Sequence, residues 1–266
     1  MPTFILGVGA PKSGTTWVYE YLRKYPNVDM GIMKEYHVWD CKFNPYDLFN
    51  EHEINLAIRE TTEEFQIRNP IRNNMRNIHG WYEDYFKNLI KGNITITGDI
   101  TPSYLALNAN NFSIIKNRLE TAGFDIKVVL LARDPIQRCW SAIRYQHASI
   151  EDKLEIFKRR HKSRVYQVRT KYDYTLTELE KVFNKENIYV GIYEEMFTDD
   201  NIRKISDFCG VGFNPSFKNE VINSGLKFDN IVDDQSAREC YSFYKPTYDY
   251  FNHRFPQTKT LWAHYS

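Results

Sequence analysis

The stretch Thr3–Trp17, TFILGVGAPKSGTTW, decides the fold. Its first part, Thr3–Val8, is apolar and β-branched, which predicts a buried strand. Gly9–Gly14 then forms a glycine-containing loop, and a helix is predicted to begin near Thr15. Such a loop binds anions, because backbone N–H groups and the positive end of the helix dipole converge on one point. The stretch therefore predicts an anion-binding loop at the edge of a sheet.

The lysine of this loop has an unusual position. The ATPase pattern GxxxxGK[ST] places its lysine directly after the last glycine, beside a hydroxyl that ligates magnesium. Here Lys12 lies inside the loop, and Thr15 follows Gly14 where the ATPase lysine would stand. A lysine inside the loop can contact the leaving-group oxygen between two anionic centres. The position indicates group transfer that needs no metal.

The rest of the chain repeats the alternation of strand and helix. Further buried strands are predicted at residues 94–97, 126–132 and 188–192. Helical patterns lie between them at 17–25, 112–119, 135–147, 176–183 and 202–208. We therefore expect one α/β domain over residues 1–266, with a P-loop-like, doubly wound fold and a central, mainly parallel sheet flanked by helices. Ligands of such folds bind beyond the carboxyl ends of the strands.

Composition excludes several classes of protein. A net charge of +1 over 266 residues gives no overall attraction for nucleic acid. No apolar run reaches the roughly 18 residues of a membrane span, and no leader is recognisable, so we expect a cytoplasmic protein. The four cysteines are widely spaced and match no metal pattern, which predicts buried free thiols and no metal site.

The segment PKSGTTW, Pro11–Trp17, resembles the 5′-phosphosulfate loop of sulfotransferases that use 3′-phosphoadenosine 5′-phosphosulfate (PAPS). The resemblance implies that Lys12 stabilises the developing charge on the bridging oxygen. It also implies that the loop holds the 5′-phosphate and the sulfonate through Lys12, Ser13, Gly14, Thr15, Thr16 and Trp17. The alternative is an ordinary turn with an exposed lysine.

A second motif follows the strand at 126–132, in KVVLLARDPIQRCWSAIRYQ. An arginine at the carboxyl end of a strand faces the ligand site, where its planar fork suits a phosphate. The spacing of Arg133 and Ser141 resembles the family's element for the 3′-phosphate of PAPS, so the resemblance assigns that phosphate to these two residues. Alternatively, Arg133 pairs with Asp134 and Ser141 only lies on a helix face.

The acceptor side is predicted from KEYHVWD, Lys34–Asp40, which resembles the KE-x-HFFD element of glycan-type sulfotransferases. That resemblance makes Glu35 the base that takes the acceptor's proton, a role that suits a carboxylate whose pKa is raised by partial burial. His37 is the competing base, because cytosolic small-molecule sulfotransferases use histidine. Both residues also have a purely structural interpretation, as a surface ion pair and a hydrogen-bonded histidine.

GDITPSYL, Gly98–Leu105, resembles a further family element, EKTPSYF, but Ile100 replaces its lysine. We expect the acceptor pocket to include Thr101, Ser103 and Tyr104, unless these residues only form a turn. The contacts to the adenosine end are less defined, with Lys227 and Arg238 as candidates.

A basic stretch follows the predicted helix at 135–147, with eight Lys or Arg against three acids between residues 151 and 171. It would attract a polyanionic acceptor, or it is a solvated face. The sequence thus predicts transfer of a sulfonate from PAPS to a hydroxyl or amine of a glycan, lipid or small molecule. A P-loop kinase and a non-catalytic polyanion-binding module are the alternatives, and the sequence does not define the acceptor, O- or N-sulfation, or the oligomeric state.

Overall fold

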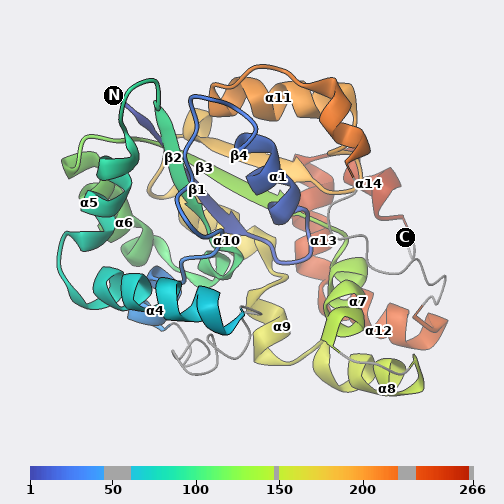
Figure 1. The fold of residues 1–266 in the computed structure, drawn as a ribbon. Coiled ribbons are helices and arrows are strands. Elements are labelled where there is room, and N and C mark those ends of the chain that lie inside the picture. The colour runs from blue at the N-terminus through green and yellow to red at the C-terminus, as the bar shows by residue number, and fades with distance from the viewer. Residues whose placement is uncertain (45–60, 147–149, 221–231, 264–266) are drawn as a thin grey trace.

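A computed structural model describes residues 1–44, 61–146, 150–220 and 232–263 (Figure 1). Its centre is a four-stranded sheet in the order β2-β1-β3-β4, in which every neighbouring pair is parallel. The strands are β1 (Thr3–Gly9), β2 (Ile96–Ile100), β3 (Asp125–Ala132) and β4 (Ile188–Ile192). The predicted α/β fold with a parallel sheet is confirmed.

The second strand lies later in the chain than predicted. Thr95 donates its N–H to the carbonyl of Asn27, so it belongs to a loop contact. The strand instead continues through Gly98, where a Cβ would lie 2.3 Å from the carbonyl oxygen of Ile5. The predicted strand ended at Thr97, because a glycine interrupts the apolar run and gives no sequence signal that two backbones approach closely there.

Helices cover both faces of the sheet (Figure 1). On one face, α1 (Thr15–Leu22) and α11 (Asp199–Cys209) pack against alternate strand residues such as Ile5 and Val129. The other face carries Phe4, Leu6 and Val128 and is covered by α5 (Trp81–Leu89), α6 (Ala109–Thr121) and α10 (Tyr172–Glu180). This arrangement follows from strands that are apolar on both sides.

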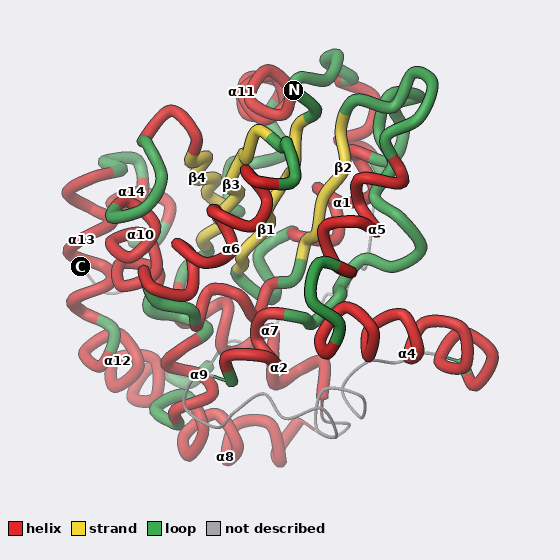
Figure 2. Tube along the Cα trace, turned by 90° about the vertical axis from the view of Figure 1, so that its left-hand side faces the viewer, coloured by secondary structure: helices red, strands yellow, loops and turns green. Residues whose placement is uncertain are grey.

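A third group of helices lies beyond the carboxyl ends of β3 and β4. Its core includes the buried aromatic residues Tyr172, Tyr248 and Phe251. The helices are α7 (Pro135–Gln146), α8 (Ile150–Arg160), α9 (Arg164–Val168), α12 (Asp234–Phe243), α13 (Lys245–Arg254) and α14 (Thr258–Leu261). Figure 2 shows the strands ending above α2, α7 and α9, so these helices border the edge where ligands of parallel sheets bind.

Among the described residues, two more helices lie in or beside residues 41–82, for which the sequence showed no clear pattern. They are α2 (Trp39–Phe43) and α4 (Thr62–Asn77). Thr61 begins α4 through a capping box with Glu64, in which each side chain accepts from the other residue's backbone N–H. The helix is mostly polar, and its buried residues include Arg72 and Arg76. A polar pattern of this kind does not reveal a helix packed on a polar site.

All four cysteines are free thiols, as predicted. Cys139, Cys209 and Cys240 are buried as expected, whereas Cys41 is partly exposed. Within the described part of the chain, no helix is long and apolar enough to cross a membrane.

Candidate active site

The loop after β1 has the geometry of an anion site. Gly14 caps the N-terminus of α1 with φ 91°, in the left-handed region. A Cβ there would lie 2.5 Å from Sδ of Met196, so only glycine fits. No side chain of the described residues caps α1. The first amides of the helix therefore remain available to a ligand.

Two hydroxyl side chains of the loop are buried beside these amides. Ser13 is fully buried, and its hydroxyl has no hydrogen-bond partner among the described residues. Such an unsatisfied group costs about 1–3 kcal/mol, and an anion's oxygen would offset that cost. Thr15 is also buried, and Thr16 is half-buried. The ring of Trp17 instead stacks on Tyr21 at 5.0 Å, so this predicted cofactor residue contributes its side chain to the core.

Arg133 joins the end of β3 to this loop. Its Nη1 donates to the carbonyl oxygen of Lys12 at 2.9 Å, and its guanidinium lies 4.3 Å from the centre of the Tyr193 ring. Its Nε is buried without a partner among the described residues. Asp134, the partner considered in the alternative interpretation, caps α7 by accepting from the N–H of Gln137 at 3.0 Å. The guanidinium is therefore directed to the loop, with donor capacity left for a ligand.

Arg144 is a candidate that the sequence analysis missed. Burial lowers its pKa, and the nearby charge of Arg133 lowers it further. Its Nε is also buried and unsatisfied within the described residues. Two neighbouring guanidiniums favour an anion between them. The half-buried Ser141 lies three residues before Arg144 and thus on the same face of α7. This spacing could have identified Arg144 from the sequence.

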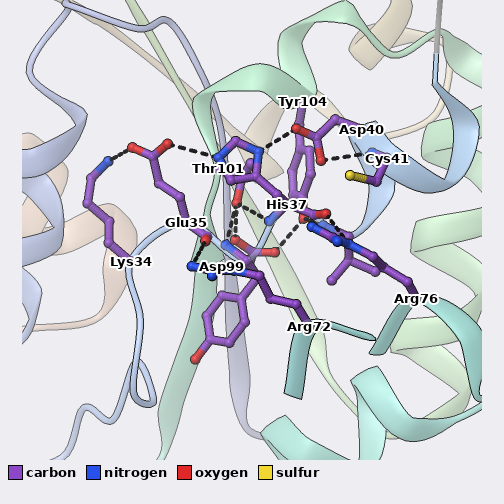
Figure 3. Close-up of polar contacts among 12 residues, drawn as sticks. Lys34, Glu35, His37, Asp40, Cys41, Arg72, Arg76, Asp99, Thr101 and Tyr104 are labelled. Atoms are coloured by element: carbon purple, nitrogen blue, oxygen red, sulfur yellow. Dashed lines mark hydrogen bonds and ion pairs between the residues drawn. The ribbon is translucent and has the colours of Figure 1, made fainter. Parts of the chain in front are cut away.

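A chain of alternating charges lies on the acceptor side, where Lys34, Glu35, His37 and Asp40 follow one another (Figure 3). Lys34 forms an ion pair with Oε1 of Glu35, whose Oε2 lies 3.3 Å from Nε2 of His37. The other ring nitrogen, Nδ1, lies 2.6 Å from Oδ2 of Asp40. His37 adopts φ 51°, a left-handed conformation that directs its ring between the two carboxylates. The two candidate bases therefore form one network.

The network fixes the protonation states. Burial would lower the pKa of His37, but Asp40 and Glu35 raise it to about 9. Burial would raise the pKa of Glu35, yet Lys34 and His37 hold it well below its ordinary value. The raised carboxylate pKa considered from sequence is thus wrong for the ligand-free protein. At neutral pH Glu35 is therefore an anion and His37 an imidazolium.

The turn after β2 holds this segment in place. The hydroxyl of Thr101 accepts from the N–H of Tyr36 at 3.0 Å and donates to Asp99 at 2.6 Å. Tyr104 accepts from the N–H of Val38 at 3.2 Å and donates to the same carboxylate at 2.6 Å. Burial raises the pKa of Asp99 to about 6, although these hydrogen bonds oppose the rise. The residue is therefore ionised at neutral pH and anchors both hydroxyls.

Helix α4 holds the same segment from the other side. Nη2 of Arg72 donates to the carbonyl oxygen of Glu35 at 3.4 Å, and Nε of Arg76 donates to that of His37 at 2.9 Å (Figure 3). These two buried arginines fix backbone positions on either side of the Glu35–His37 contact. Such support is typical of a site whose side chains must hold a defined geometry.

Some residues predicted for the acceptor pocket have other positions. Thr101 and Tyr104 are fully buried and scaffold the charged segment, and Ser103 is also buried. Ile100, which replaces the family's lysine, is part of the core. Arg238 is exposed on α12, and Lys227 lies outside the described residues.

The two halves of the site meet at one edge of the sheet. The N–H of Thr101 donates to the carbonyl of Gly7 at 3.0 Å. A Cβ on Gly9 would lie 3.0 Å from the carbonyl oxygen of Pro102. The anion loop and the turn that supports Glu35 and His37 are therefore in direct contact. An anion loop beside a fixed carboxylate–histidine network suits enzymes that transfer an anionic group.

The family follows from comparison with known proteins. The family model described as "Sulfotransferase domain" matches residues 2–240. The chain belongs to the sulfotransferase family and is a sulfotransferase enzyme, which answers both the kinase and the non-catalytic alternatives. A search of curated proteins found no match.

A solved structure with a TM-score above 0.5 shares the fold, and others are similar to this chain at lower scores. A sulfotransferase from Alicyclobacillus acidocaldarius is 18% identical, with a TM-score of 0.60 and 96% of each chain covered. The sulfotransferase domain of the Synechococcus PCC 7002 olefin synthase is 14% identical, covering 91% of this chain and 94% of that one at a TM-score of 0.49. Mouse sulfotransferase SULT7A1 complexed with PAP is 15% identical, covering 92% and 83% at a TM-score of 0.48.

Proposed function

We propose that this sulfotransferase moves the sulfonate group of PAPS to a hydroxyl or amine of its acceptor. The observation that carries the proposal is a hydrogen bond that links the two candidate anion-binding sites. Arg133, at one site, donates to the carbonyl of Lys12 in the other at 2.9 Å. A nucleotide with phosphates at both ends of its ribose matches such a pair of sites, whereas a nucleotide with one phosphate group would leave the second site unfilled.

The residues present fit the cofactor. The buried Ser13 hydroxyl and the uncapped amides of α1 would hold the 5′-phosphate and sulfonate. Arg133, Arg144 and Ser141 would hold the 3′-phosphate. When bound, PAPS supplies an activated sulfonate on a phosphate leaving group. Lys12 and the loop amides then neutralise the charge that grows on that leaving group, as in other transfers of anionic groups.

Glu35 is the proposed base. It is ionised at neutral pH, whereas His37 already carries its proton and cannot accept another. A weakly basic carboxylate suffices when the acceptor's proton leaves late, because the hydroxyl becomes more acidic as its oxygen bonds to sulfur. His37 donates to Glu35 and, through its other N–H, to Asp40, and so orients the base. His37 thus acts as a positioning residue.

Nucleotide binding tests the proposal. Calorimetry should show that adenosine 3′,5′-bisphosphate (PAP) binds at least about tenfold more tightly than adenosine 5′-monophosphate. Arg133→Gln should remove most of that preference, since it deletes a donor to the 3′-phosphate. Equal binding of the two nucleotides by the unmodified protein would contradict the assignment.

Turnover tests the role of the loop lysine. Lys12→Ala should abolish transfer from labelled PAPS, because charge on the leaving group is no longer neutralised. Lys24→Ala is the matched control: it removes the same charge from an exposed position just beyond α1. Near-normal transfer by Lys12→Ala would exclude the proposed role of Lys12.

A further inference from the structure

A cavity of about 340 Å³ lies next to the proposed site, between α7, α8 and α9. Its lining includes Arg138, Ala142, Arg160, Ser163, Tyr166 and Arg169. The volume suits a small molecule or the terminal unit of a larger one. No residue given above as part of the nucleotide site or the charge network lines it.

The cavity is strongly cationic. Three of its lining residues are arginines, and no carboxylate lines it. Arg138 is 1% exposed, Arg169 is half-buried and Arg160 is exposed, so the guanidiniums follow the cavity from its closed end to its mouth. A buried guanidinium is costly unless an anion or several hydrogen bonds compensate it. The lining is therefore suited to a negatively charged group.

The closed end of the cavity carries unsatisfied donors. Among the described residues, the hydrogen bond of the Arg138 guanidinium goes to a thiol and not to a carboxylate, and its Nε has no hydrogen-bond partner. Its guanidinium lies 5.1 Å from the Tyr166 ring, and the hydroxyl of Tyr166 is also buried without a partner within that part of the chain. These two groups make a built site, with a charged donor and a neutral donor at its base.

One neighbouring group supplies part of the missing charge. Nη2 of Arg138 donates to Sγ of Cys139 at 3.4 Å, and this cation helps to lower the pKa of that buried thiol to about 5. A thiolate would compensate one guanidinium. Arg160 and Arg169 still face the cavity.

The cavity adjoins the charge network that contains the proposed base. The pKa of Arg169 is lowered by burial and by Arg138, while Asp40 and Glu35 oppose this effect, so all four charges lie within electrostatic reach. Helix α9 lies beyond the carboxyl ends of the strands, below the sheet in Figure 2. An acceptor in the cavity would thus lie within electrostatic reach of Glu35.

The basic residues at 151–171 fall into two groups in the structure. Lys158 pairs with Glu155 at 3.1 Å, and Lys162 pairs with Glu239 at 3.5 Å, both on the surface. Arg160 and Arg169 line the cavity instead. The stretch is therefore in part a solvated face and in part the wall of a defined site.

We propose that the sulfate acceptor is itself an anion, and that its carboxylate, phosphate or sulfate group binds in the cavity among Arg138, Arg160 and Arg169. This inference rests on the proposed function. The planar fork of arginine binds such oxyanions through paired hydrogen bonds. The oxyanion anchors the acceptor, and its free hydroxyl or amine extends toward Glu35.

Matched acceptor pairs test the proposal. Labelled PAPS is supplied with pairs in which a carboxylate is replaced by its neutral ester or amide: 4-hydroxybenzoate and its methyl ester, glucuronic acid and its methyl ester, and serine and serine amide. The expected result is that the best acceptor is an anion, with kcat/KM at least about tenfold above its neutral partner. A neutral compound as the best acceptor, or no transfer to any anionic member, overturns the inference.

Variants at the mouth of the cavity localise the effect. Arg160→Gln should raise KM for the best anionic acceptor about fivefold or more with kcat nearly unchanged, because one donor to the oxyanion is lost. Arg159→Gln removes the same charge from the neighbouring exposed residue, which does not line the cavity, and should leave KM unchanged. An equal effect of both variants, or none, overturns the assignment of the cavity.

Binding of PAP separates the two proposals. Both variants should bind PAP as the unmodified protein does. If PAP binds and neutral acceptors are sulfated preferentially, only the inference about the acceptor fails. If PAP does not bind, the proposed function fails as well.

Discussion

The pH dependence of transfer distinguishes Glu35 from His37 as the base. The pKa of His37 is about 9 in the folded protein, so at pH 7 only about one molecule in a hundred carries a neutral imidazole. A mechanism with His37 as base would therefore raise kcat/KM nearly tenfold from pH 7 to pH 8, and about 50-fold between pH 7 and 9. With Glu35 as base, kcat/KM stays level over that range. It then falls above pH 9, as His37 loses the proton that it donates to Glu35.

The assay measures transfer of label from PAPS to an acceptor that does not itself titrate between pH 6 and 10. The parameter is kcat/KM, because it reports the groups of the free enzyme, to which these pKa values apply. Glu35→Gln should lower it about 10²–10⁴-fold, the usual contribution of a general base. Glu20→Gln is the control, since Glu20 lies near the surface and forms an ion pair with Arg23 at 3.4 Å.

Two results would refute this reasoning. One is a continuous rise of kcat/KM from pH 7 to pH 9, which assigns the base to His37. The other is a Glu35→Gln variant that retains the activity of the Glu20→Gln control, which excludes Glu35 from proton transfer.

Three further predictions concern stability. His37 has an ordinary pKa of 6.5 and a folded pKa of about 9, so its charge contributes about 3 kcal/mol to stability that is fully present below pH 6.5 and lost as pH rises through 9. The free energies of unfolding in urea of the unmodified protein and His37→Gln should therefore differ by about 3 kcal/mol less above pH 9 than below pH 6.5. A difference that does not change with pH would contradict this prediction. Gly14→Ala should destabilise by about 1–3 kcal/mol more than Gly123→Ala, because both have φ near 90° but only Gly14 meets Met196; equal melting temperatures of the two variants would exclude this clash. Tyr104→Phe should cost about 2 kcal/mol in urea unfolding, since the N–H of Val38 and the Asp99 carboxylate each lose a partner; an unchanged free energy of unfolding would show that water replaces the hydroxyl.

The parts of the fold that the sequence predicts are those with a local pattern. β1, β3 and β4 are continuous apolar runs, and α11 ends at Gly210, a glycine in the left-handed conformation that is common after a helix. The anion loop is equally local, because a strand, a glycine-containing loop and a helix follow one another directly. Each of these features depends on residues within a few positions.

The parts that it does not predict depend on distant residues. Helix α4 is polar because it packs its arginines on the Glu35–His37 segment, so its apolar pattern is weak. The contact between Glu35 and His37 depends on the left-handed conformation of His37, which a histidine does not indicate in the sequence as a glycine would. Tyr193, which packs on Arg133, lies beyond the end of β4, sixty residues later in the chain. No spacing rule connects such positions.

The register of β1 and β3 has a consequence for how a ligand's length is recognised. These strands pair from Thr3 and Asp125 to Gly9 and Leu130, and the two proposed phosphate-binding elements begin where they end. Arg133 then ties those elements to each other through the Lys12 carbonyl. The separation between them is therefore fixed by the backbone hydrogen bonds of the sheet and by this one partly buried side-chain contact. Selectivity for the span of a nucleotide would thus persist through surface substitutions that leave the sheet and Arg133 in place.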